Sequence, residues 1–401
     1  MKTTLLSCSA LACATALPLP AADTLTDAFA KGQVTLTLRL RYENVQQTAL
    51  RDATALTLRT RLGFITAPLN GWSALLEAEN ITAVDGDSYS QAGLNPGGAG
   101  RAVIADPEST EINQALLRGV LGKTTLTLGR QRLVLDNARF VGDVGWRQNM
   151  QTFDAVSLTD KSLEATTLTY AYLDRINRVF GDHHAQGYWQ SNSHLFNASY
   201  AGYAAGTLTG YAYLLDFKKA AAAQSCATYG ASFAGTAKLN ESYKFAYRAE
   251  FAHQTDYGSS TLNYATSYYD LEAGLTAKQG SLTLGREVLG SDHNVGFKTP
   301  LATLHAFNGW ADLFLATPAA GLRDTYVKAT ASLPAAVSLV AFEHWYEAAT
   351  TGARLGSEFN LQLSRKFGQS VTGLVKYASF RRDSALFPNV QKIWAQVEFA
   401  R

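Results

Sequence analysis

Two segments near the N-terminus alternate apolar and polar residues strictly. Residues 34–43 read VTLTLRLRYE and residues 56–64 read LTLRTRLGF. A period of two predicts β-strands with one apolar and one polar face. Leucines fill the apolar register, and the polar register holds Arg39, Arg41, Arg59 and Arg61. The rest of the chain repeats this alternation with little sign of a second sheet that would cover the leucines. We therefore expect the leucine face to meet lipid and the arginine face to line a pore.

Turn signals divide the chain after its first thirty residues into further segments of this kind. Their lengths, about 10 to 14 residues, suit tilted transmembrane strands. We expect eighteen strands, at residues 33–46, 54–67, 71–83, 110–121, 124–135, 150–159, 163–174, 193–204, 206–217, 225–239, 241–253, 266–278, 281–290, 323–333, 335–347, 355–367, 370–381 and 391–400. The predicted fold is all-β, a transmembrane antiparallel barrel.

The predicted connections alternate between tight and long, as outer-membrane barrels require. Tight turns fall near residues 160–162 and 279–280, whereas long loops fall at 84–109, 136–149 and 291–322. A nineteenth strand at 303–315 would break this alternation. We assign that segment to the last of these long loops and expect it to fold into the lumen.

The ends and composition of the chain fit an exported barrel. Residues 1–22 have the layout of a cleaved signal peptide, which leaves residues 23–401 as the barrel. Cys226 is the single cysteine after residue 22, so no intramolecular disulfide is expected. We find no apolar run of about 18 residues beyond the signal, which argues against membrane helices. A membrane-spanning chain of this kind must then form a closed barrel in the bacterial outer membrane.

Charge is balanced overall, and its arrangement carries the functional signal. The formal net charge is +2, so nothing favours a nucleic-acid partner. If turns centre near residues 50 and 69, antiparallel pairing builds two rows across three strands. These rows are Arg39 with Arg61 and Glu77, and Arg41 with Arg59 and Glu79. Barrel closure adds Lys376 and Lys392 to the cationic wall, and Asp270 and Glu272 face it from the other side.

Candidate catalytic and metal-binding groups are weak. His183 and His184 lie in a loop without further ligands at metal-binding spacing, so we expect no metal and no other cofactor. No nucleophile motif marks a serine. Facing arginines would keep Glu77 and Glu79 ionised, which suits charge balance better than proton transfer. The chain is therefore not expected to be an enzyme.

Several longer motifs carry a family resemblance. They are RLRYE at 39–43, LRTRLGF at 58–64, LGRQRL at 128–133, RFVGDVGWRQNMQTFD at 139–154 and HAFNGWADLFL at 305–315. Together they resemble the alginate export porins of Gram-negative bacteria. The resemblance implies an eighteen-stranded barrel whose Arg- and Lys-lined constriction, narrowed by inserted loops, passes polyuronate. It makes Arg41, Arg61, Arg130 and Arg147 candidate constriction residues and 303–315 a pore loop with Asn308, Trp310 and Asp312.

We therefore expect a passive outer-membrane channel for anionic solutes, with an acidic polysaccharide such as alginate as the solute. If residues 303–315 fold inward, Trp310 and Phe314 could offer stacking surfaces for a sugar, although aromatic residues in such barrels more commonly lie at the membrane interface. A general porin for small hydrophilic molecules is the alternative, followed by an outer-membrane enzyme or adhesin. The expected partners are outer-membrane lipid and the solute, and the sequence leaves any periplasmic partner undefined.

Overall fold

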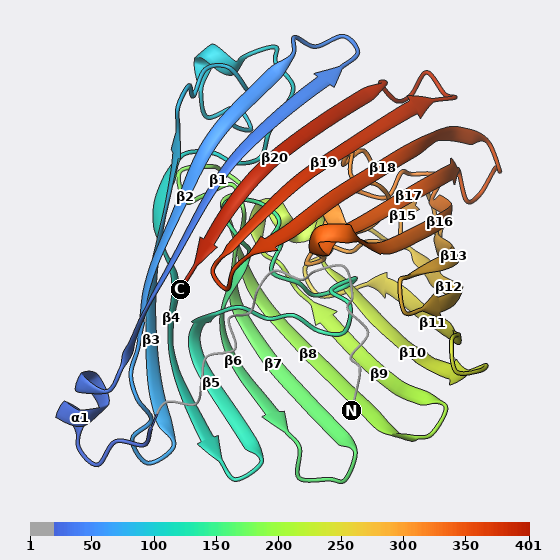
Figure 1. Ribbon diagram of the computed structural model, residues 1–401. Helices are drawn as coiled ribbons and strands as arrows, with labels where there is room; N and C mark the ends of the chain where they lie inside the picture. Colours follow the sequence, from blue (N-terminus) through green and yellow to red (C-terminus); the bar gives the residue numbers. More distant parts are fainter. Residues whose placement is uncertain (1–19) are drawn as a thin grey trace.

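The computed structural model describes residues 20–401, which form a closed antiparallel barrel of eighteen strands (Figure 1). Closure comes from pairing of the first and last strands, in which Arg39 lies opposite Glu398 and Arg41 opposite Gln396. The fold and the number of barrel strands predicted from the alternation are confirmed. Residues 1–19 of the expected signal peptide lie outside the described residues.

The barrel strands follow each other around the ring in sequence order. They are β1 (Gln33–Gln47), β2 (Ala53–Ile65), β3 (Trp72–Ala83), β4 (Ser109–Leu121), β5 (Thr124–Gln131), β6 (Thr152–Asp160), β7 (Thr166–Asn177), β8 (Tyr188–Tyr203), β9 (Gly206–Leu215), β10 (Cys226–Lys238), β11 (Lys244–Asp256), β12 (Ala265–Ala277), β13 (Gly280–Leu289), β16 (Leu322–Leu333), β17 (Val337–Glu347), β18 (Arg354–Phe367), β19 (Val371–Arg382) and β20 (Val390–Ala400).

The remaining elements are short. They are helix α1 (Leu25–Ala30), the hairpin strands β14 (Ser291–Asp292) and β15 (Val295–Gly296), and the 3-10 turns η1 (Pro96–Gly98), η2 (Lys219–Gln224), η3 (Leu304–Ala306) and η4 (Pro334–Ala336). Helix α1 is not among the elements predicted from sequence. Its first turn is capped by the Thr24 hydroxyl, which accepts a hydrogen bond from the Asp27 amide.

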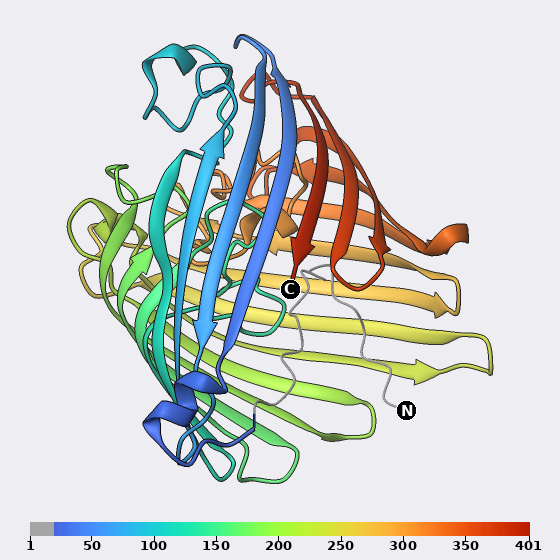
Figure 2. The same cartoon turned by 60° about the vertical axis from the view of Figure 1, so that its left-hand side comes forward.

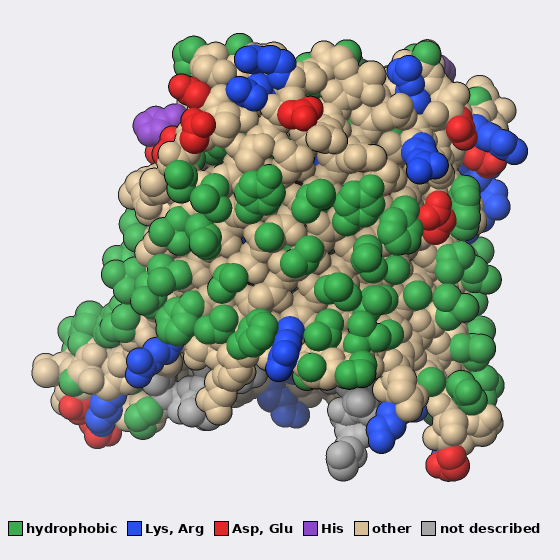
Figure 3. Space-filling view, turned by 45° about the horizontal axis from the view of Figure 1, so that its top comes forward, with side chains coloured by type: hydrophobic (Ala, Val, Ile, Leu, Met, Phe, Trp, Pro, Cys, Tyr) green, Lys and Arg blue, Asp and Glu red, His purple; other side chains and the backbone are tan. Residues whose placement is uncertain are grey.

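The apolar register of the strands faces outward. Leu40, Leu58 and Leu62 are exposed, whereas Arg39, Arg59 and Arg61, which alternate with them, are buried. Figure 3 shows the result as a broad apolar belt with charged side chains gathered above and below it. Because such a belt matches the hydrocarbon layer of a membrane, the closed barrel is a bacterial outer-membrane structure. Among residues 20–401, no helix is long and apolar enough to cross a membrane.

Long connections leave one end of the barrel, and two of them enter its lumen. Residues 132–151, which we call the first inner segment, join β5 to β6, and residues 297–321, the second inner segment, precede β16. The first inner segment crosses the interior as the teal trace in Figures 1 and 2. Residues 303–315 contain no barrel strand, in agreement with their assignment to a loop.

Strand register differs from the expected rows. Arg39 lies opposite Arg59, Arg41 opposite Thr57, and Arg61 opposite Glu79, while Glu77 lies opposite Gly63. The predicted rows of Arg39, Arg61 and Glu77 and of Arg41, Arg59 and Glu79 are therefore wrong. Ala49 and Asn70 adopt left-handed backbone at the turn centres, one residue away from each assumed centre. A one-residue change in a turn centre moves every partner by two residues and keeps the same face inward.

Candidate functional site

Arginines of β1 and β2 form the cationic wall, and the first inner segment covers them. The side chains of Arg39, Arg41 and Arg59 are each about 1% exposed. Arg39 Nε donates to Glu398 Oε2 of β20 at 2.5 Å, and its Nη1 donates to the Gly145 carbonyl at 3.0 Å. Arg61 pairs with Glu79 and donates to the Gln148 carbonyl. The wall therefore anchors the inner segment through arginine donors.

Arg59 is the least neutralised member of this wall. Its Nη2 lies 3.9 Å from Glu398 Oε1, at the edge of ion-pair distance. Its Nε and Nη1 are buried and have no hydrogen-bond partner among the described residues. Arg39, directly opposite on β1, shares the same Glu398 carboxylate. One carboxylate thus serves two neighbouring guanidinium groups.

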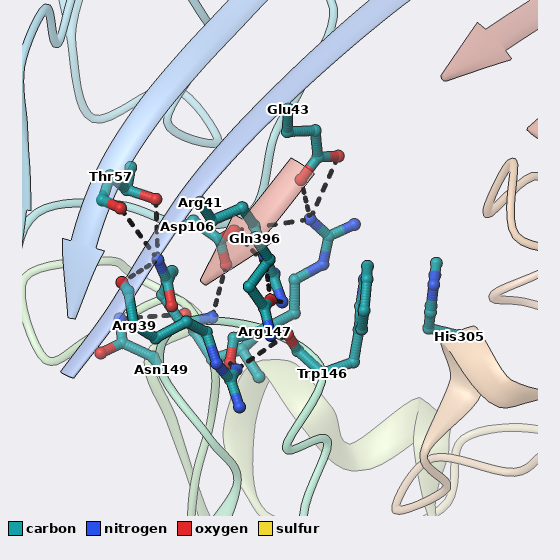
Figure 4. Close-up of polar contacts among 12 residues, drawn as sticks. Arg39, Arg41, Glu43, Thr57, Asp106, Trp146, Arg147, Asn149, His305 and Gln396 are labelled. Carbon is teal, nitrogen blue, oxygen red and sulfur yellow. Dashed lines mark hydrogen bonds and ion pairs between the residues drawn. The ribbon is translucent and has the colours of Figure 1, made fainter. Parts of the chain in front are cut away.

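Trp146, at the tip of the first inner segment, lies between a cation and an imidazole. The Arg41 guanidinium lies 4.2 Å from the centroid of Trp146, and the His305 ring stacks on the indole with the centroids 4.6 Å apart. Figure 4 shows the two rings parallel. Arg41 is held in place by Gln396 of β20, which accepts from its Nε and Nη2 at 3.0 and 2.6 Å. This arrangement connects the wall, the first inner segment and the second inner segment.

Asp312 of the second inner segment connects the same three parts through charge. Its Oδ2 lies 2.8 Å from Arg147 Nη2 of the first inner segment and 2.8 Å from Lys392 Nζ of β20. Arg147 Nη1 also pairs with Glu43 Oε2 of β1 at 3.2 Å. Burial alone would raise the pKa of the Asp312 carboxyl, but contacts with His305, Lys392 and Arg147 hold that pKa well below its usual value. Asp312 is therefore ionised at neutral pH.

His305 completes this network, and its neighbours define its tautomer. Lys376 Nζ of β19 lies 2.7 Å from Nε2, and Asp312 Oδ1 lies 2.7 Å from Nδ1. Burial lowers the pKa of the imidazole well below its usual value, against the opposing effect of Asp312, so the ring is neutral. The Lys376 ammonium must donate to Nε2, and Nδ1–H donates to Asp312. Lys376 also lies over the Trp310 ring, 3.6 Å from its centroid.

Backbone groups seat the second inner segment on β18. The Trp310 amide donates to Asn360 Oδ1 at 3.2 Å, and the Ala311 amide donates to Glu358 Oε1 at 2.8 Å. Gly309, at φ +87°, lies so close to β17 and β18 that an added Cβ would overlap the Tyr346 hydroxyl and the Glu358 carboxylate. Glycine is required here by both backbone conformation and space.

The structure brings most of the sequence-predicted cations together. Arg39, Arg41, Arg59, Arg61, Arg147, Lys376 and Lys392 lie on the wall or on the first inner segment that covers it. We call these seven side chains the cationic cluster. Arg130 is not among them. It continues the outward register of Leu126 and Leu128, and its guanidinium forms a two-point ion pair with Asp154 at 2.7 and 3.1 Å. The placement of Arg130 in the constriction, which rested on the resemblance, is therefore wrong.

The acidic residues predicted to line the pore lie in two different parts of the barrel. Glu79 neutralises Arg61, whereas Glu77 accepts hydrogen bonds from Asn113 and Gln114. Across the ring on β12, Asp270 Oδ2 lies 3.5 Å from Arg248 Nε, and Glu272 accepts from the Tyr326 hydroxyl at 2.5 Å. These partners of Glu77, Asp270 and Glu272 thus lie outside the cationic cluster.

Residues of the predicted pore loop are covered inside the lumen. Asn308 bridges Glu287 and Asp324 through Nδ2, at 2.5 and 3.1 Å, and accepts from Arg139. Trp310 is 5% exposed and Phe314 is 6% exposed. Their rings contact Lys376 and Tyr346, respectively, so neither offers a free surface on which a sugar could stack. The structure therefore gives no support to the stacking alternative considered for these two rings.

Four contributors to the site were missed. Trp146 and His305 lie within the two long motifs, near the predicted Arg147 and Asn308. The motifs could therefore have identified both as candidate site residues. Gln396 has the inward parity of β20. Asp106, whose Oδ1 accepts from the Gln148 amide at 2.8 Å, comes from the long 84–108 connection and has no local sequence signal. Among the described residues, no group of His, Cys, Asp or Glu is arranged to hold a metal ion, and His183 is exposed.

Comparison with solved structures places the fold among outer-membrane porins. Pseudomonas aeruginosa OccK9 (OpdG) matches with a TM-score of 0.73 and 14% identity, over 93% of this chain and 100% of that chain. OpdK of the same organism, solved with vanillate, matches with a TM-score of 0.74 and 13% identity, over 93% and 99% of the two chains. Acinetobacter baumannii OccAB2 matches with a TM-score of 0.72 and 14% identity, over 94% and 99%.

These neighbours belong to the Occ/Opd group of substrate-specific porins. They support the porin fold that the sequence resemblance implied, but not alginate export in particular. No family model matches the sequence. A search of curated proteins finds no relative.

Proposed function

We propose that this protein is a passive outer-membrane channel for anionic solutes, with small carboxylates as the first solutes to test. The observation that carries the proposal is the gathering of cations on one side of the lumen, where they share carboxylates. Glu398 pairs with both Arg39 and Arg59, and Asp312 pairs with both Arg147 and Lys392. Buried like charges produce a strong local field, which attracts an anion into the constriction.

Arginine donors also match the geometry of a carboxylate. Guanidinium groups bind carboxylates through paired N–H donors, and Arg59 retains two buried donors without a partner among the described residues. The neighbour OpdK, solved with vanillate, makes an aromatic monocarboxylate a reasonable first probe. Alginate export is the finer form of the proposal. It rests on motif resemblance, and the buried Trp310 and Phe314 remove one feature that would favour a sugar polymer.

The proposal is tested by recording single channels in a planar lipid bilayer under a KCl gradient. We expect a reversal potential displaced toward that of chloride, and concentration-dependent block by vanillate and galacturonate. Block by oligouronates at lower concentrations than by the monomer would favour the polysaccharide form. Conductance without ionic preference, and without block by any carboxylate, would instead indicate the alternative of a general porin for small hydrophilic molecules.

A further inference from the structure

Asp312 fills a site that is suited to a carboxylate. Three donors converge on its two oxygens: Arg147 Nη2 and Lys392 Nζ on Oδ2, each at 2.8 Å, and His305 Nδ1 on Oδ1 at 2.7 Å. The Asp312 side chain is 6% exposed. Two of the three donors are members of the cationic cluster to which we assign attraction of the solute. The protein's own carboxylate therefore occupies a position in which a solute carboxylate would be bound.

The contacts of Asp312 join the two inner segments through side chains rather than through the main chain. The bases of the two segments are joined by main-chain hydrogen bonds, from the Gly142 amide to the Leu301 carbonyl at 2.8 Å and from the Thr303 amide to the Ala138 carbonyl at 3.0 Å. The tips, residues 146–147 of the first segment and 305–312 of the second, are joined by side chains, through Arg147 with Asp312 and Trp146 with His305. Arg139, next to the main-chain bonds, also donates to Asn308 at 3.1 Å. Loss of the Asp312 contacts would leave the Trp146–His305 stack to hold the tips, while the main-chain bonds keep the bases joined.

The backbone conformation of the second inner segment also favours release of Asp312. Asn308, Gly309 and Asp312 all have positive φ, at 54°, 87° and 62°. Non-glycine residues keep such conformations when surrounding contacts impose them. For Asp312 those contacts are the three donors, so its release also relieves a strained backbone.

We propose that Asp312 is a built-in counter-ion that competes with the solute: a solute carboxylate that binds Arg147, Lys392 and His305 displaces Asp312 and separates the tips of the two inner segments. The proposal rests on the proposed function, because it assigns the carboxylate site within the same channel. The channel is then closed by its own carboxylate at rest and widened by the anion that it carries. Lys376, which donates to the far side of the His305 ring, keeps Nδ1–H directed at whichever carboxylate is present.

The experiment compares Asp312→Asn with wild type in planar bilayers, using galacturonate as the blocking anion. The amide keeps the shape of the side chain and removes its charge, so the competitor is weakened. We expect a larger open-channel current and block at about tenfold lower galacturonate concentration. The matched control is Glu250→Gln, which removes one buried lumenal carboxylate on β11, where Glu250 pairs with Arg248 of the same strand. The control should shift ionic preference slightly and leave the galacturonate concentration for half block within about twofold of wild type.

Equal block in the Asp312→Asn variant, the control and wild type would overturn the competition proposal while leaving the anion channel intact. Absence of anion preference and of block in wild type would instead refute the proposed function. If Asp312→Asn does not fold, as judged by heat-modifiable migration in SDS gels, wild-type tryptophan fluorescence provides the readout. Galacturonate at blocking concentrations should change that fluorescence by unstacking Trp146 from His305, and Trp146→Phe should lose most of the change. An unchanged wild-type spectrum at blocking concentrations would refute the displacement.

Discussion

The Trp146 indole lies flat against the His305 imidazole, with their planes 2° apart and their centroids separated by 4.6 Å. Arg41 covers the opposite face of the same indole. This stack joins a barrel strand to both inner segments. We expect Trp146→Ala to lower the free energy of unfolding by about 3 kcal/mol, because a large packed aromatic side chain and its cation contact are removed together.

That loss is measured by urea unfolding of the barrel in phospholipid vesicles. The same variant should show larger and noisier single-channel currents, since the tips lose their contact. Trp345→Ala is the control, because Trp345 is 47% exposed on the outer face of β17. Equal current noise in the two variants would contradict a role for the stack in holding the tips.

Arg61 and Arg130 should differ sharply in their effect on permeation. Arg61 pairs with Glu79 inside the lumen, whereas Arg130 pairs with Asp154 on the outward register. Removal of Arg61 leaves Glu79 as an unneutralised lumenal carboxylate, so Arg61→Gln should reduce the chloride-to-potassium permeability ratio roughly twofold. Arg130→Gln should leave the ratio unchanged. Reversal potentials under a KCl gradient provide the comparison, and an equal shift in both variants would place Arg130 in the ion path.

Acid should weaken the contacts of the second inner segment. The neutral His305 has a pKa below its ordinary value of 6.5, so below that pH the unfolded chain binds a proton that the folded chain does not. Asp312, whose pKa is lowered as well, acts with the same sign below about pH 4. Stability from His305 is therefore complete above pH 6.5 and falls as the pH decreases. The groups facing His305 are Asp312 on its own segment, Lys376 on β19 and Arg147 on the first inner segment.

The expected slope attributable to His305 approaches about 1.4 kcal/mol per pH unit between pH 6 and 5. It is obtained by subtracting the pH profile of His305→Asn, which keeps one donor toward Asp312 and does not titrate, from that of wild type. Identical profiles would show that His305 becomes protonated in the folded barrel at its ordinary pKa.

Gly309 provides a test of how the second inner segment is seated. A Cβ there would overlap Tyr346 and Glu358, and φ is +87°. Gly309→Ala should unseat the segment, increase the open-channel current and cost about 2 kcal/mol in unfolding free energy. Gly352→Ala separates the two causes, because Gly352 has φ +70° with nothing within 4 Å of an added Cβ. An increased current in both variants would attribute the effect to backbone conformation alone.

Alternation was sufficient to predict the barrel, because a period of two directly reports which side chains face lipid. Facing direction was therefore correct for Arg39, Arg41, Arg59 and Arg61. The predicted pairing of the strands was not correct, because pairing depends on where each turn is centred. The turn centres, at left-handed residues such as Ala49, lie one position away from those assumed. No periodic pattern reports that conformation in advance.

The alternating pattern also could not predict which residues cover the arginines. Parity places Arg39 inward but contains no information about what lies over it, which here is the main chain of Gly145 to Arg147. Asp106 illustrates the same limit, because a loop carboxylate reaches the cationic cluster only through the path of a long connection. The motifs around Arg147 and Asp312 located both inner segments correctly, whereas the motif around Arg130 pointed to a side chain on the outward register.

Closure of the barrel between β1 and β20 has a consequence for biogenesis. Arg39 and Arg41 stand on the first strand, and their acceptors Glu398 and Gln396 stand on the last. Until that final joint is made, a partly inserted barrel presents guanidinium groups without these acceptors along its free edge, which is costly in a membrane. Completion of the ring and neutralisation of the wall are therefore one event, so an unfinished, leaky barrel is unfavourable compared with the finished one.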